Sequence, residues 1–378
     1  YRPAPLVPIF QSINCFRYIL CNLENSRDMD ELFQYLSHLM TILRNNYMRA
    51  LYRRDYGFPL LSHILVTRVR RKLKLSLPIQ FFNLFQKFCG WNFSNISKSL
   101  IEDESAYQSL ILNIDIWYTS SSESHSGHGG VEIIRFLLFQ IGSLIEASEL
   151  CSLNSQKLRK LNVLKTFCNN QHIFAEQQGY PNVFDELSSD LSNVYNLLLK
   201  DELRRANIQW FLQFSYSELK SGFYQNSEVA FDAVDSLFTE VLDTTETNKI
   251  RCITDSISCK FLLMALGETI LGKRSPVTIL NILLKVLLVN ETAYKNFIRS
   301  NGLDLLFYML KNADSCYYED VVYLLYGYSL GDYNVELNLK QFENGIIHPN
   351  ATVVMKELQL LSINLLEWAV VNDISNTF

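Results

Sequence analysis

The chain has 378 residues, which is enough for two or three ordinary domains or for one continuous solenoid. Apolar residues make up 48% of it and charged residues only 19%, so we expect a large core and some apolar surface that a partner or the rest of a longer polypeptide covers. The net charge of −5 argues against a protein that binds nucleic acid with its whole surface.

The cysteines and the apolar runs indicate a cytoplasmic protein. Eight cysteines are scattered, mostly in apolar helical stretches, which predicts buried free thiols rather than a disulfide framework. No apolar run approaches the roughly 20 residues of a membrane span, and the richest, 277–289, carries Lys285 and predicts a buried core helix. Since the chain starts at Tyr1 rather than Met, we expect it to be an excerpt of a longer protein.

Along the chain, apolar residues recur at spacings of three and four, which predicts helices almost everywhere. Clear stripes run through 32–43, 61–73 and 229–242. Period-two alternation of useful length is hard to find, so a sheet is not expected. Ser275-Pro276 places a capping hydroxyl before a proline and predicts the start of another helix.

Three segments are predicted to be loops from their composition. Residues 1–8 hold three prolines, and residues 331–350 mix Gly, Asn, Asp and Pro. Residues 119–130 are rich in Ser and Gly and predict a flexible insertion.

An internal repeat is the most informative feature. Three passages share an aromatic residue five positions before a glycine, an apolar residue directly after the glycine and again four after, and a leucine eight after. The glycines are Gly57, Gly179 and Gly302, and their separations of 122 (179 − 57) and 123 (302 − 179) are each close to three units of about 41 residues. Because glycine tolerates a positive φ, we expect each to form a sharp corner between two helices.

Residues 290–310 resemble an armadillo repeat, in which a short helix and a glycine precede a leucine-rich helix that ends in a polar turn, here 312–314. The resemblance implies an all-α fold: an armadillo/HEAT-like, right-handed superhelical solenoid. We expect residues 1–378 to form a single continuous repeat domain interrupted by the insertion at 119–130.

The stretch YLLYGYSLGD at 323–332, with a composition rich in Asn, Ser, Tyr and Phe, resembles the solenoid upstream of the BEACH domain in beige/neurobeachin-type trafficking proteins, and would suit a fungal member. The resemblance implies a non-catalytic protein-interaction scaffold, part of a large cytoplasmic protein in vesicle trafficking or protein sorting. Three alternatives stay open: an armadillo-type cargo adaptor, a formin-like regulatory domain that binds a GTPase, and an enzyme, which would require a convergent polar pocket.

Catalytic and cofactor motifs are not found. The stretch 267–274 has the glycines of a phosphate-binding loop but lacks the Ser/Thr after Lys273, so it predicts the end of a helix. His125 and His128 are close to each other, but a zinc site would need further ligands and a rigid frame. We therefore expect no enzyme activity, no cofactor, no metal and no small-molecule substrate.

A basic stretch is the strongest charge feature. Four cations project away from the apolar stripe of 61–73, namely Arg68, Arg70, Arg71 and Lys74. They are interpreted either as a solvated face whose stems cover apolar surface or as a patch that docks an anionic partner, including an anionic membrane surface. The second interpretation would make the protein peripheral on membranes.

Overall fold

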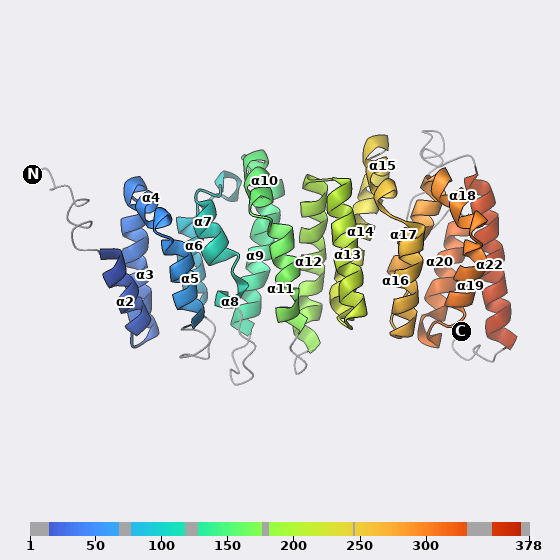
Figure 1. Ribbon diagram of the computed structural model, residues 1–378, viewed down its shortest axis with the longest axis horizontal. Helices are drawn as coiled ribbons and strands as arrows, with labels where there is room; N and C mark the ends of the chain where they lie inside the picture. The colour runs from blue at the N-terminus through green and yellow to red at the C-terminus, as the bar shows by residue number, and fades with distance from the viewer. Residues whose placement is uncertain are drawn as a thin grey trace, which may run out of the picture. The chain divides into compact units, whose positions relative to one another are not determined.

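The computed structural model describes residues 15–67, 77–117, 128–175, 181–244, 246–330 and 350–371. Throughout these ranges the regular secondary structure is helical, which confirms the all-α prediction. The chain divides into two compact units, unit 1 (Tyr1–Asp190) and unit 2 (Leu191–Phe378) (Figure 1). A single continuous domain and a right-handed superhelix stay predictions.

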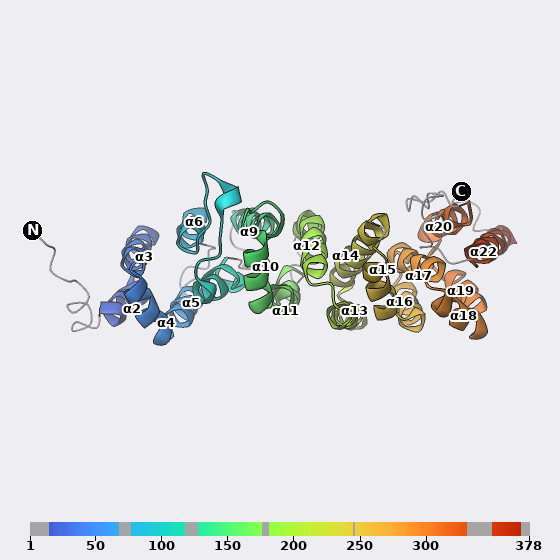
Figure 2. The same ribbon diagram turned by 90° about the horizontal axis from the view of Figure 1, so that it is seen from above.

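Unit 1 is built from helices in two layers. α2, α5 and α8 follow one another in one layer, while α3, α6 and α9 follow one another in the second (Figure 2). The helices are α2 (Cys15–Asn25), α3 (Met29–Leu43), α4 (Asn46–Arg54), α5 (Gly57–Thr67), α6 (Ile79–Phe88), α7 (Glu104–Ala106), α8 (Ile114–Trp117), α9 (His128–Glu146), α10 (Cys151–Lys160), α11 (Val163–Ala175) and the first part of α12 (Pro181–Asp201).

Unit 2 repeats this arrangement. α13, α16 and α19 contact one another in sequence, and α14, α17 and α20 form the second layer (Figure 2). The helices are α13 (Arg205–Lys220), α14 (Tyr224–Asp243), α15 (Thr247–Ser256), α16 (Cys259–Leu271), α17 (Val277–Val289), α18 (Glu291–Arg299), α19 (Gly302–Leu310), α20 (Tyr318–Leu330) and α22 (Ala351–Val371). Each of these helices thus packs on the next helix of its own layer, as expected for stacked repeats.

The predicted apolar stripes form the core where they lie in the described residues, which exclude 68–73. On α14, Val229, Ala233, Leu237 and Val241 recur every four residues, and all four are buried. The short helices α4 and α18 begin where a side-chain oxygen caps the backbone: Asn290 Oδ1, for example, accepts from Ala293 N at 3.0 Å.

At the two described glycine corners, the reason why glycine is needed differs from the predicted one. Gly57 and Gly302 are the first residues of α5 and α19 and are buried. The positive φ lies one residue earlier, at Tyr56 (φ 56°) and Asn301 (φ 52°). A Cβ on either glycine would lie 2.5 Å from the Tyr52 ring or 2.7 Å from the Phe297 ring. Glycine is therefore required there because an aromatic ring covers its Cα, and the turn itself is made by the preceding residue.

Gly179 lies outside the described residues. A third corner of the same geometry occurs instead at Asn162 (φ 50°), directly before α11. There Val163 occupies the glycine position, and the residue five earlier is Leu158, which is buried. Because a valine stands where the other two corners have glycine, a search for glycines misses this corner.

The spacing of the repeats is less regular than a fixed unit of 41 residues: it is 41 residues (318 − 277) between the starts of α17 and α20 but differs elsewhere. Along the first layer, 57 residues (114 − 57) separate the starts of α5 and α8, and 43 residues (302 − 259) separate those of α16 and α19. The nearly equal distances between the three glycines are therefore not multiples of a fixed unit.

The bounds and lengths of the helices test three smaller predictions. α9 begins at His128, so the last three residues of the predicted 119–130 insertion are helical, while 119–127 lie outside the described residues. The stretch 267–274 ends a helix as predicted, because α16 stops at Leu271. By length and composition, none of the described helices alone could span a membrane, and α17 with α18 passes only as a pair bent by 110°.

Candidate binding groove

A groove of about 670 Å³ lies in unit 2 where two consecutive repeats meet. One side is the α15–α16 turn, in which Ile257 and Ser258 are extended. The other side is α18 with the start of α19, joined at the Asn301 corner. The volume is within the range of ordinary ligand sites, so the groove can hold a substantial part of a partner molecule.

The floor of the groove is apolar and its edges are polar. Phe297 and Gly302 at its base are buried, and Leu305 is 45% exposed. Arg205, Lys260 and Asp255 supply charges of both signs, and further amide and hydroxyl groups come from Ser258, Asn290, Thr292, Asn296 and Ser300. An apolar base with mixed polar edges suits a protein segment, whose backbone and side chains present both kinds of group.

Cys259, which also lines the groove, is not set up as a nucleophile. Burial raises the pKa of its thiol to about 11, so the thiol is protonated at neutral pH. A catalytic cysteine needs a lowered pKa and a nearby base or cation. Within the described ranges, no group of three or more His, Cys, Asp and Glu side chains could hold a metal ion.

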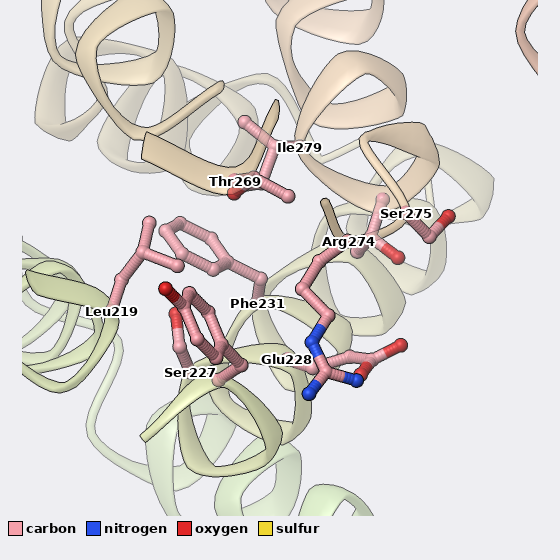
Figure 3. Close-up of a pocket in the computed structure, with 10 residues that line it drawn as sticks. Leu219, Ser227, Glu228, Phe231, Thr269, Arg274, Ser275 and Ile279 are labelled. Atoms are coloured by element: carbon pink, nitrogen blue, oxygen red, sulfur yellow. The ribbon is translucent and has the colours of Figure 1, made fainter. Parts of the chain in front are cut away.

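A second, much smaller pocket lies beside the stretch that resembles a phosphate-binding loop (Figure 3). Its volume of about 30 Å³ is that of a water molecule and is far too small for a nucleotide. Figure 3 shows Arg274 and Glu228 among the residues that line it, and the Arg274 guanidinium lies 5.2 Å from the centre of the Tyr224 ring.

A buried polar network holds the second layer of unit 2 together. Lys285 on α17, predicted to lie in a core helix, is 2% exposed and pairs with Asp235 on α14 at 2.7 Å. Its ammonium also donates to Thr239 at 2.6 Å, while Asn281 Nδ2 donates to Asp235 Oδ2 at 2.8 Å. The Tyr328 hydroxyl of α20 donates to Asn281 Oδ1. These contacts join α14, α17 and α20, the second layer of unit 2.

The predicted site residues are distributed unevenly over these features. Gly302 lies in the groove, whereas Gly57 lies in unit 1 against Tyr52. The anionic-partner patch of Arg68, Arg70, Arg71 and Lys74 lies outside the described residues. Arg205, Lys260 and Leu305 were missed, because nothing in the local pattern distinguishes them from other exposed positions of an amphipathic helix.

Comparison with known proteins gives a family. Residues 320–378 match a family model described as Beige protein homolog 1, TPR repeats. Over 376 residues, or 99% of its length, the chain is 38% identical to Beige protein homolog 1 of Saccharomyces cerevisiae, of which it spans 17%. No solved structure matches. The predicted resemblance is thus confirmed: the chain is similar over nearly its whole length to a helical-repeat segment of a beige-type protein.

Proposed function

We propose that this chain is a non-catalytic scaffold segment of a large cytoplasmic protein, and that it acts in vesicle trafficking or protein sorting by binding other proteins. The observation that carries the proposal is the groove of unit 2, with its exposed Leu305 and its cations Arg205 and Lys260 on packed helices. The similarity to Beige protein homolog 1, a member of the family expected from the sequence, supports the trafficking role.

The form of the groove favours protein binding over catalysis. Its lining combines buried Ile257 and Phe297 with side chains of both charges, and its Cys259 thiol has a raised pKa rather than the lowered one of a nucleophile. A screen for esterase, phosphatase and nucleotide-hydrolysing activity is therefore expected to give no turnover above background. Turnover that persists through purification and disappears on substitution in the groove would contradict the proposal.

The test of binding compares two charge-introducing variants. Leu305→Asp places a carboxylate on the apolar part of the groove, while Leu271→Asp changes an 81% exposed leucine outside it. Quantitative affinity capture with the chain is expected to lose a specific set of proteins, enriched in vesicle-sorting factors, with Leu305→Asp alone. Capture that is the same for both variants and the unmodified chain would refute the role of the groove.

The function itself can be tested in a chimaera. The chain replaces the corresponding segment of the yeast relative, and the delivery of a fluorescent vesicle cargo is scored. We expect Leu271→Asp to deliver cargo like the unmodified chimaera and Leu305→Asp to fail at equal protein abundance. Normal delivery with Leu305→Asp would contradict the proposal.

A further inference from the structure

The last described helix, α22, buries apolar side chains on one flank and exposes further apolar side chains, among polar ones, on the opposite flank. Its inner flank packs on α17, α19 and α20 through Val354, Leu358, Leu361 and Leu365. Six exposed apolar side chains lie away from that flank and are called here the outer face of α22: Val353, Leu360, Ile363, Leu366, Val370 and Val371.

These exposures are a property of α22 and are not typical of the fold. Of the 22 large apolar side chains exposed in the described residues, six lie on this one helix. Leu360 is 60% exposed and Val370 64%. Leu360, Ile363 and Val370 are three and seven residues apart, so they share one side of the helix, opposite the buried stripe.

A solenoid that ends at a helix needs a polar outer flank there, because the flank faces water. On α22 that flank is mixed: Thr352, Lys356, Gln359, Asn364 and Glu367 are exposed between the apolar side chains. In the same unit, the second-layer helices α14 and α17 each have an apolar flank that the following helix covers. The outer face of α22 likewise places six exposed apolar side chains on the flank where a following helix would pack.

We propose that the outer face of α22 is the docking surface for a further helical repeat of the same polypeptide, following Phe378. Two observations favour this occupant over a separate protein. The family model of repeats that matches 320–378 includes α20 and α22, so the helical pair that carries the face is itself of the repeat type. The yeast relative is much longer than the matching segment, which is 17% of it.

The first experiment measures accessibility at the face. Ile363→Cys, and Leu271→Cys as the matched control on α16, are placed in the 378-residue chain and in a longer polypeptide that continues past Phe378. Maleimide labelling of each peptide is followed by mass spectrometry. We expect residue 363 to label about tenfold or more slowly in the longer polypeptide, with residue 271 unchanged. Equal labelling of residue 363 in both would overturn the proposal.

A second variant separates this occupant from a second copy of the chain. Leu360→Asp with Ile363→Asp is expected to leave the thermal midpoint of the 378-residue chain within about 2 °C, because both side chains are exposed there. In the longer polypeptide the same pair should expose the segment after residue 378 to limited proteolysis. The proposal would be overturned if the proteolysis pattern did not change. It would also be overturned if the short chain sedimented as a dimer and residue 363 became protected as its concentration rises.

Discussion

Replacing Asp235 by alanine is expected to destabilise unit 2 strongly, because it leaves a buried cation without its carboxylate. Lys285 is 2% exposed, and its ammonium lies 2.7 Å from Asp235 Oδ1. Removing one partner of a buried ion pair costs about 3–5 kcal/mol. Since the Thr239 hydroxyl at 2.6 Å remains as a partner, we expect the lower end of that range, about 3 kcal/mol.

The second half of the prediction is that a further substitution restores stability. Lys285→Met keeps the length of the side chain and removes the charge that must be neutralised. Asp235→Ala with Lys285→Met is therefore expected to be more stable than Asp235→Ala alone, by about 2 kcal/mol, which is a coupling energy typical of contacting residues. The exposed pair Glu246–Lys249 serves as the control, and its disruption should cost less than about 1 kcal/mol.

The assay is urea unfolding at pH 7, with hydrogen exchange measured on peptides from α14 and α17 so that the change is assigned to unit 2. The prediction is refuted if Asp235→Ala lowers the free energy of unfolding by no more than the surface control does. It also fails if adding Lys285→Met to Asp235→Ala brings no recovery, since the cost would then not come from the uncompensated lysine.

Four further predictions follow from individual side chains. Gly302→Ala should destabilise the chain by about 1–3 kcal/mol, because its Cβ would overpack the Phe297 ring. Adding Phe297→Leu should recover part of that loss in thermal unfolding. If it brings no recovery, the ring contact is not the cause. Burial raises the pKa of Asp232 to about 6, so the folded state holds that proton to higher pH than the unfolded state, and stability should fall as pH rises from about 4 to 6. Asp232→Asn should flatten this dependence and add about 1–2 kcal/mol at pH 7, and an unchanged pH profile would count against it. Cys259, whose pKa is raised to about 11, should react with iodoacetamide at pH 7 much more slowly than the exposed Cys21, as peptide mass spectrometry can measure. The anionic-patch hypothesis is tested by replacing its four cations with glutamate, namely Arg68, Arg70, Arg71 and Lys74. This charge reversal should weaken binding to anionic vesicles in low salt, and unchanged binding would remove the hypothesis.

The sequence was sufficient for the helical fold because its signal is local. Spacings of three and four identify helices such as α14, and the apolar run around Lys285 identified a core helix correctly. The partner of Lys285 could not be read in the same way. Asp235 lies 50 residues earlier, and only the packing of α17 on α14 brings the two together.

One of the corners and the groove could not be predicted from local sequence patterns. A search for the glycine motif finds the corner at Gly302, where the Phe297 ring requires glycine, but not the corner at Asn162, where Val163 takes that position. The groove combines the end of α15, the start of α16, α18 and the start of α19, so its lining residues have no shared motif. Such a site is a product of how two repeats stack, and single-sequence periodicity holds no information on it.

Site-specific photo-crosslinking in cells tests most directly whether the chain works by holding another protein in this groove. A photoreactive amino acid replaces Leu305 in the groove and, in a parallel strain, Leu271 outside it. The proposed function predicts discrete adducts with another protein from position 305 and none of these adducts from position 271. Position 305 yielding no adduct beyond those of position 271 would contradict it.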